Sequence, residues 1–369
     1  MHSTLTLLVF SGLAAAHRPS WNNRPWRNDG SEVQTSSGRI QGKTDPALPH
    51  VRQFLGIPYA QPPVGGLRWA APQQLSQPDV EVDATSLPPS CLQYLNTEAS
   101  SVYIDDVLEF NLQGLNRTGS ISEDCLTLSV WAPSQAKNGN WQRGKKSKGL
   151  PVLIFIYGGG FSTGGQDVPY QIPAQWVERS QEHIVVSFNY RVNIFGHPNA
   201  AGLEDQNPGL LDQRAAVEWV QKNIAAFGGD PDRTVLWGQS AGSISVDYYN
   251  FAYPSDPIVT GLIMDSGTAQ SPIATTDTAQ TNFTFVADNV GCSGFGSDAA
   301  GRLACMRKVN AAAIEDFVAQ YQISGQMPAI GFRPVIDEET VFLNYTEQAL
   351  EGKQAKIVSE HDCREHVGS

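Results

Sequence analysis

The stretch that decides the fold is Thr234-Val235-Leu236-Trp237-Gly238-Gln239-Ser240-Ala241-Gly242. Residues 234–237 are an apolar run that predicts a buried strand, and residues 243–249 can continue as a helix. Gly-x-Ser-x-Gly between a strand and a helix is typical of a sharp turn that exposes a serine hydroxyl. Glycines are needed on both sides because any side chain there would collide with neighbouring backbone. In this context the pattern predicts that Ser240 is a nucleophile rather than an ordinary serine in a glycine-rich turn.

Three further apolar runs, at 152–157, 183–189 and 261–264, predict buried parallel strands, because strands covered by helices on both faces are apolar throughout. Apolar side chains recur at helical spacing between residues 211 and 227, and Gly228-Gly229 follows as a stop. Strand, helix and strand in this order form a βαβ unit, which predicts a mostly parallel sheet covered by helices. Residues 277–325 are more polar, and we expect them to form a cap of helices and loops over the sheet.

A glycine triplet follows the predicted strand 152–157, within Tyr157-Gly158-Gly159-Gly160-Phe161. Acyl transfer builds negative charge on a carbonyl oxygen, and backbone N–H groups aimed at that oxygen stabilise it. Consecutive glycines allow such a close approach of the main chain. The triplet therefore predicts part of an oxyanion hole, and the amide of Ala241, next after the nucleophile, is the expected remaining donor.

The totals limit the classes of function. The chain has 369 residues, 41% of them hydrophobic, and a net charge of −12. One large α/β domain fits this length as well as two small ones. An acidic chain without a basic stripe argues against nucleic acid as a partner.

The N-terminus predicts export. Residues 5–16 form a short apolar run that ends in Ala14-Ala15-Ala16, as in a signal peptide over residues 1–16 that is cleaved before His17. The alternative, a membrane helix, needs a longer run to cross a bilayer of about 30 Å, and no later segment is long enough either. Sequons at Asn116, Asn282 and Asn344 predict glycosylation and agree with secretion.

Five cysteines in an exported chain predict disulfides with one cysteine left over. Cys292 and Cys305 are close in sequence and flank a glycine-rich turn, so we expect them to pair. Cys91 and Cys125 would then close a second loop, which leaves Cys363 without a partner.

Several longer motifs occur in a fixed order. They are Phe54-Leu55-Gly56-Ile57-Pro58-Tyr59-Ala60, Glu123-Asp124-Cys125-Leu126-Thr127-Leu128-Ser129-Val130-Trp131, Asn189-Tyr190-Arg191, and Phe227-Gly228-Gly229-Asp230-Pro231 leading to the Ser240 pentapeptide. Together they resemble the type B carboxylesterase/lipase family, which includes the cholinesterases and secreted fungal lipases. The resemblance runs from about residue 38 to residue 355.

This resemblance implies an α/β-hydrolase fold and hydrolysis of small-molecule or lipid carboxylic esters, with neither metal nor cofactor. It implies Ser240 as the nucleophile and the amides of Gly159, Gly160 and Ala241 as the oxyanion donors. It also implies the disulfides Cys91–Cys125 and Cys292–Cys305, which are the pairs that the spacing of the cysteines predicts.

The family places an acidic residue after a later strand, and a histidine later still. Residues 351–357 resemble the approach to that strand, whereas residues 358–369 are polar and show no strand pattern. We therefore predict a carboxylesterase domain over residues 17–357, a non-family tail over 358–369, and a truncated chain whose final strands are missing.

The remaining histidines offer no clear base. We expect His50 on the surface, His183 at a strand edge and His197 in packing. In the tail, His361 and His366 stand beside Asp362 and Glu365, and a base cannot face an acid one residue away without a special turn. Asp265, an alternative acid, is better explained as a loop carboxylate.

Since a serine needs a positioned base near neutral pH, we expect this chain to be nearly inactive. We also expect it to fold poorly, because missing final strands and helices would leave an apolar strand edge open to water. The alternative function is that of a non-catalytic, esterase-like binding or adhesion protein, which the intact Ser240 motif disfavours.

Overall fold

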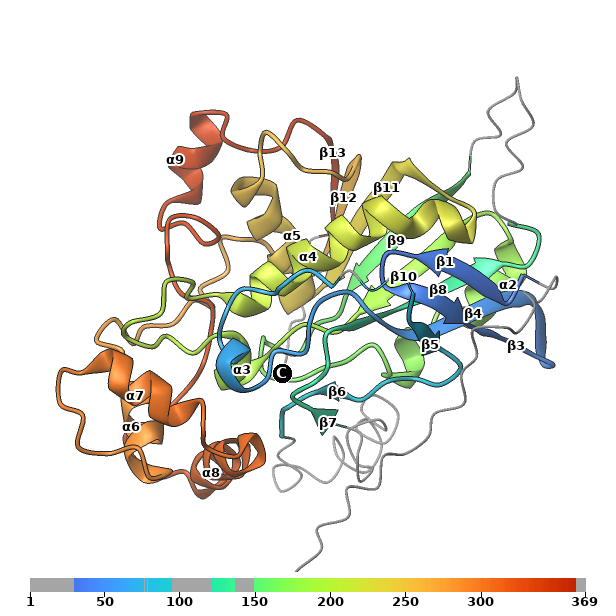
Figure 1. Ribbon diagram of the computed structural model, residues 1–369. Coiled ribbons are helices and arrows are strands. Elements are labelled where there is room, and N and C mark those ends of the chain that lie inside the picture. The colour runs from blue at the N-terminus through green and yellow to red at the C-terminus, as the bar shows by residue number, and fades with distance from the viewer. Residues whose placement is uncertain (1–29, 76, 78, 95–120, 137–148, 363–369) are drawn as a thin grey trace, which may run out of the picture.

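The structure is a computed structural model that describes residues 30–362 except 76, 78, 95–120 and 137–148 (Figure 1). An eight-stranded sheet runs through the molecule in the order β13-β12-β11-β9-β10-β8-β4-β3. Its strands are β3 (Lys43–Asp45), β4 (Leu48–Pro58), β8 (Thr127–Pro133), β9 (Leu150–Ile156), β10 (Ile184–Phe188), β11 (Gly229–Gln239), β12 (Gly261–Asp265) and β13 (Val358–Asp362). Two small sheets contain β1 (Glu32–Thr35), β2 (Gly38–Gln41) and β5 (Glu81–Asp83), and β6 (Ser90–Cys91) with β7 (Ile121–Ser122).

The four predicted strands are present as β9, β10, β11 and β12, and neighbours among them pair in parallel. The predicted helix between β10 and β11 is α4 (Pro208–Asn223), which continues as the 3-10 turn η5 (Ile224–Phe227). Gly228 ends it with a φ of 94°, a left-handed conformation that glycine adopts without a steric cost. The βαβ unit is confirmed, but its two strands are not neighbours, because β9 lies between them.

The prediction that residues 358–369 contain no strand is wrong for the first five of them. Val358–Asp362 form β13, which pairs in parallel with β12 so that Val358 lies opposite Gly261 and Asp362 opposite Asp265. Strand pairing requires only main-chain hydrogen bonds, and an edge strand tolerates polar side chains. An apolar pattern therefore cannot reveal such a strand. Residues 363–369, including Cys363 and His366, lie outside the described residues.

The two faces of the sheet are covered differently. Val186 of β10 belongs to a large core with residues of α4 and of α5 (Ala241–Ala252). Its neighbour Val185 points to the other face, where it packs with Ala174 and Val177 of α2 (Ala174–Ser180). That helix lies on β4 and β8, at one end of the sheet.

An aromatic groove of about 310 Å³ occupies the α2 face over the strands that α2 does not cover. Phe155 and Trp237 are paired across β9 and β11, with ring centroids 4.6 Å apart, and form its floor. Trp176 of α2 forms a wall and is 44% exposed. Gln239 and Asp265, at the carboxyl ends of β11 and β12, also line this groove.

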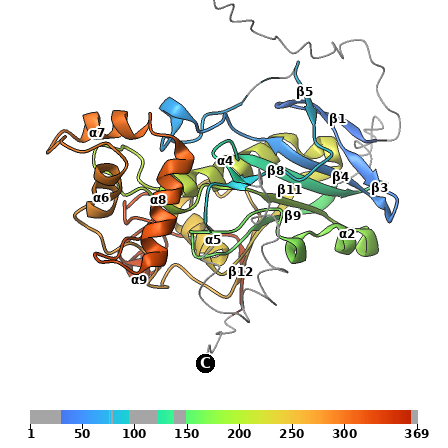
Figure 2. The same cartoon turned by 90° about the horizontal axis from the view of Figure 1, so that it is seen from below.

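The predicted cap is present as α6 (Thr281–Asn289), α7 (Ala299–Met306) and α8 (Ala311–Ser324), which share an apolar core with Trp69, Leu92 and residues of the segment 194–200. Both views show these helices grouped together beside the sheet (Figures 1 and 2). The remaining helices are α3 (Asn193–Gly196), α9 (Tyr345–Leu350) and the 3-10 turns η1 (Gly65–Leu67) and η4 (Pro169–Gln171).

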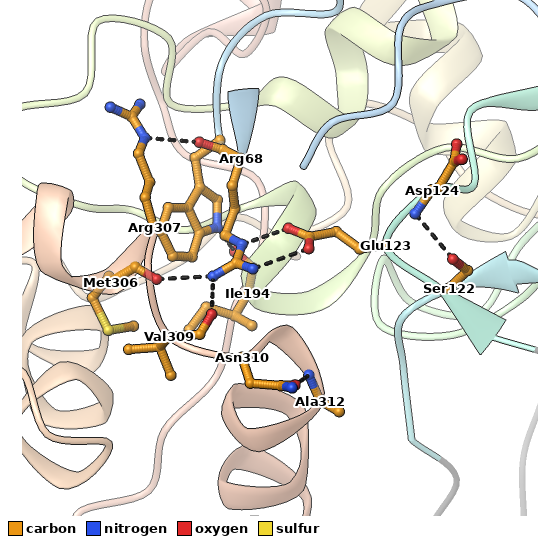
Figure 3. A network of polar contacts seen from close by, with 11 residues as sticks. Arg68, Ser122, Glu123, Asp124, Ile194, Met306, Arg307, Val309, Asn310 and Ala312 are labelled. Carbon is orange, nitrogen blue, oxygen red and sulfur yellow. Dashed lines mark hydrogen bonds and ion pairs between the residues drawn. The ribbon is translucent and has the colours of Figure 1, made fainter. Parts of the chain in front are cut away.

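Arg68 connects the cap to the N-terminal part of the chain (Figure 3). Its guanidinium pairs with both carboxylate oxygens of Glu123 and donates at 2.8 Å to the carbonyls of Met306 and Val309. Met306 is the last residue of α7 and Val309 lies three residues beyond it, at a helix end where carbonyls lack intrahelical partners. The side chain of Arg68 is 5% exposed, so these contacts are buried. This explains why an arginine follows η1.

Two disulfides join the predicted pairs, Cys91 with Cys125 and Cys292 with Cys305. The second closes the loop between α6 and α7. Within the described residues, no helix is both long and apolar enough to cross a membrane.

Replacing Arg68 by Met should lower the free energy of unfolding by about 3 kcal/mol, because Glu123 and two buried carbonyls would lose their donors. Urea denaturation measures this. The control is Arg233→Met, which removes an exposed arginine and should change stability by less than about 0.5 kcal/mol. Equal stability of the two variants would contradict a docking role for Arg68.

Candidate active site

Ser240 stands at the turn between β11 and α5 with φ 55° and ψ −121°. A positive φ is strained for a residue with a side chain and persists only where the surroundings enforce it, at a cost of about 1–3 kcal/mol. Here the Ser240 amide donates to the Asp265 carbonyl at 2.9 Å, and its carbonyl accepts from the Ile244 amide at 3.0 Å. The predicted sharp turn is therefore present, and main-chain bonds hold it on both sides.

The glycines around Ser240 are required by close approach of main chains. A Cβ added to Gly238 would lie 2.1 Å from the Gly242 carbonyl oxygen, and one added to Gly242 would lie 2.0 Å from the Ile156 carbonyl oxygen. Both distances are far below van der Waals contact with backbone that cannot move aside. β9, β11 and α5 therefore meet at the turn with no room for side chains.

The glycine triplet lies against this turn. A Cβ on Gly158 would lie 2.9 Å from the Cβ of Ser240, so the loop after β9 and the serine are immediate neighbours. Gly159 has φ 115° and Gly160 has φ 60°, both in the region that favours glycine. The Gly159 carbonyl accepts from the amides of Ser162 and Thr163 at 3.0 and 3.1 Å, which fixes the loop.

Three backbone amides at this place have no acceptor among the described residues: those of Gly159, Gly160 and Ala241. Ala241 is the first residue of α5, where a helix leaves its N–H groups free and carries a partial positive charge. The structure thus brings the predicted nucleophile and the predicted donors together, and it leaves those donors available for a negatively charged oxygen.

A buried ion pair holds the segment that follows β10. Arg191 donates through Nη2 and Nε to the two carboxylate oxygens of Asp212 at 2.7 and 2.8 Å, and its amide adds a third bond at 3.0 Å. Asp212 lies in α4 and is completely buried. Nearby, the stacked rings of Tyr157 and Tyr190 exchange hydrogen bonds with each other's carbonyls, which ties the end of β9 to this segment.

Sequence reasoning missed a second support of the glycine loop. The Asn193 amide donates to the Phe161 carbonyl at 2.7 Å, and the Asn193 side chain donates to Oε1 of Glu315 at 3.1 Å. Glu315 belongs to α8 of the cap and is 4% exposed. Burial raises its pKa to about 8, and its Oε2 has no partner within the described residues. The signal in the sequence is an acid beside Ile314, on the buried side of a helix.

The histidines agree with the expectations for them. His50 is exposed and pairs with Glu178, and His183 is half-buried beside Trp176. His197 is fully buried with its ring edge-on to Phe161, and burial lowers its pKa to about 3. Within the part of the chain that the structure describes, no hydrogen bond joins Ser240 to any of these three. His361 lies in β13, and its side chain is outside the description.

The predicted glycosylation sites differ in their surroundings. Asn344 is exposed and begins α9. Asn282 is half-buried, and its side chain donates to the Gly331 carbonyl at 2.9 Å. Asn116 lies outside the described residues.

Comparison with known proteins agrees with this fold and this geometry. A family model described as carboxylesterase family matches residues 29–360. The chain belongs to the carboxylesterase family. It therefore has the α/β-hydrolase fold, and the match ends three residues beyond the predicted domain boundary at 357.

The carboxylesterase relatives include three named proteins. Chlorogenic acid esterase of Aspergillus niger is 49% identical over 352 residues, which cover 95% of this chain and 65% of the relative. Secreted lipase 5 of Gibberella zeae is 40% identical over 333 residues, 88% of this chain and 61% of the relative. Cholinesterase of Mus musculus is 38% identical over 250 residues, 66% of this chain and 38% of the relative. The chain thus spans less than two thirds of the length of these carboxylesterases.

Replacing Glu315 by Gln should change how stability depends on pH. The folded protein keeps the Glu315 proton up to about pH 8, whereas an unfolded chain loses it near the ordinary pKa of 4.5. This group's contribution to stability is therefore complete below pH 4.5 and is lost as the pH rises to 8. Glutamine retains the bond to Asn193 and cannot ionise, so the variant should gain on the order of a few kcal/mol over the native protein by pH 8.

Urea denaturation at pH 5, 6.5 and 8 measures this difference. The control is Asp288→Asn, an exposed carboxylate on the cap helix α6, for which the difference should stay constant. A constant difference for Glu315→Gln as well would show that the native carboxyl is already ionised at pH 5.

Proposed function

We propose that this protein hydrolyses carboxylic esters through an acyl-serine intermediate formed on Ser240. One observation carries the proposal. Ser240 is held at φ 55° against Gly158 of the glycine loop, and the amides of Gly159, Gly160 and Ala241 have no acceptor within the described residues. A strained nucleophile next to free donors is the arrangement that acyl transfer requires.

The chemistry follows from these groups. Ser240 Oγ attacks the ester carbonyl carbon and gives its proton to a base, and the three amides stabilise the negative charge on the carbonyl oxygen. The tetrahedral species then expels the alcohol, which takes up a proton. Water attacks the acyl-serine in the same way and releases the carboxylic acid. Removing one oxyanion donor typically costs about 3 kcal/mol of transition-state stabilisation.

Hydrolysis at an ordinary rate needs a base that accepts the proton of Ser240 Oγ. His197 is buried and has a pKa of about 3, so it cannot serve, and His50 and His183 make contacts elsewhere. The described residues therefore supply the nucleophile and the oxyanion hole without a base. An enzyme with a complete triad reacts about 10⁴- to 10⁶-fold faster than one that lacks its base, so the base of Ser240 is the group that sets the rate.

The relatives suggest the substrates and the location. One relative is named for chlorogenic acid and another is named a secreted lipase, so phenolic and lipid esters are the classes to test first. The two disulfides and the name of the second relative support secretion, which agrees with a signal peptide over residues 1–16. We propose Asn344 as the best glycosylation site because its side chain is exposed.

Labelling with a fluorophosphonate probe tests the site without requiring turnover. We expect the native protein to react slowly and stoichiometrically at Ser240, identified by peptide mass spectrometry, and Ser240→Ala to remain unlabelled. Ser243→Ala is the matched control, because Ser243 lies three residues later and its hydroxyl is bonded to the Gly267 carbonyl at 2.6 Å. That variant should label like the native protein.

Hydrolysis of p-nitrophenyl butyrate completes the test. Turnover that Ser240→Ala abolishes is the expected result, and turnover that survives this substitution would contradict Ser240 as the nucleophile. A folded protein that neither labels nor hydrolyses would instead favour the non-catalytic binding or adhesion role.

A further inference from the structure

An arginine from the cap side of the molecule lies against the oxyanion loop. Arg333 belongs to the irregular segment after α8, and its side chain reaches Gly160. A Cβ on Gly160 would lie 2.8 Å from Arg333 Nη1 and 3.8 Å from Cζ. The guanidinium therefore occupies the space where a side chain of residue 160 would stand. A positive charge thus adjoins one of the three amides proposed to hold the oxyanion.

The guanidinium of Arg333, a half-buried residue, lacks ion-pair partners among the described residues. Its Nη1 is buried without a hydrogen-bond acceptor, and no ion pair among the described residues includes it. Burial lowers the pKa of Arg333 from its ordinary value, although the group stays charged near neutral pH. A buried donor without an acceptor lowers the stability of the fold. The position of Arg333 therefore needs an explanation other than stability.

The main chain on both sides of Arg333 is fixed. The Gly331 carbonyl accepts from the Asn282 side chain at 2.9 Å, and the Pro334 carbonyl accepts from the Thr275 amide at 2.8 Å. Phe332 is buried in the core of the cap. The guanidinium is therefore presented by a rigid segment, which lowers the entropy lost when it binds a ligand.

Among the described residues, the neighbours of Arg333 do not neutralise it. Tyr94 is half-buried, and the charge of Arg333 acts to lower its pKa while burial raises it. Glu315 also acts on Tyr94, but it keeps its own proton up to about pH 8 and is neutral at pH 7. His197 is neutral as well. Counting only the residues that the structure describes, the charge beside Gly160 is therefore positive.

We propose that the guanidinium of Arg333 binds a carboxylate carried by the substrate, so that this site prefers esters with a free carboxylate group. The planar fork of arginine matches a carboxylate with two parallel hydrogen bonds. Because Arg333 lies beside Gly160, the carboxylate and the ester carbonyl can belong to one small molecule. This assignment rests on the proposed function, since it gives a substrate class to the same site.

Equilibrium binding tests the assignment independently of catalysis. The protein carries Ser240→Ala, which prevents turnover, and the probes are benzyl hydrogen succinate and its neutral counterpart, benzyl methyl succinate. Isothermal titration calorimetry should show the acid ester binding about 10- to 100-fold more tightly than the neutral ester, as expected for a charge-assisted pair.

Variants at position 333 assign the preference to the guanidinium. Arg333→Met and Arg333→Gln should bind both esters equally. Arg333→Lys should keep only part of the preference, since an ammonium lacks the fork. Arg233→Met, which removes an exposed arginine, is the matched control and should retain the full preference. Circular dichroism of each variant establishes that it is folded, and two different neutral residues guard against a single variant that fails to fold.

Equal binding of the two probes to the Ser240→Ala protein would overturn the inference, as would a preference that survives Arg333→Met. Failure to bind the acid ester in the millimolar range would also overturn it. A carboxylate preference in a protein whose Ser240 never labels would leave this subsite standing and would refute the hydrolase function.

Discussion

The approach of main chains around Ser240 is the constraint on which the rest of the structure depends. β9, β11 and α5 come so close that a methyl group at Gly238 or Gly242 would meet a carbonyl oxygen at about 2 Å. The strained φ of Ser240 survives only because these elements cannot separate. The parallel pairing of β9 with β11 and the α5 helix packed on both strands supply that rigidity. The glycine loop directly follows β9, so it lies next to Ser240.

Long-range polar contacts connect this rigid centre to the cap. Asn193 joins the loop carbonyl of Phe161 to the cap acid Glu315, and Arg68 joins Glu123 to the end of α7. The Asn193 link runs from Phe161 of the large core to the cap, whereas Trp69, next to Arg68, shares the apolar core of the cap helices. The cap is therefore part of the frame that positions the oxyanion loop. On the α2 face, Trp176 and Tyr170 are exposed beside the aromatic groove, whereas Phe155 of β9 is buried.

The elements that could be predicted are those that local rules dictate. A short sequence pattern encodes each of them. These are the glycines around Ser240, the apolar strands and the glycine that ends the helical segment after α4. β13 has no such pattern, because its pairing with β12 uses main-chain bonds and tolerates polar side chains at an edge. Glu315 and Arg333 were missed for another reason. Their importance arises from contacts with Asn193 and Gly160, which are more than 100 residues away, and no local pattern encodes such a meeting.

The absence of a side chain at Gly160 determines where the charged guanidinium of Arg333 lies. The missing side chain leaves a space that the tip of Arg333 fills, and that tip belongs to a flexible side chain rather than to fixed backbone. An added methyl group there would displace the guanidinium more readily than it would disturb the sheet. A larger residue at position 160 would therefore act twice, by displacing the guanidinium of Arg333 and by straining a backbone whose φ of 60° favours glycine.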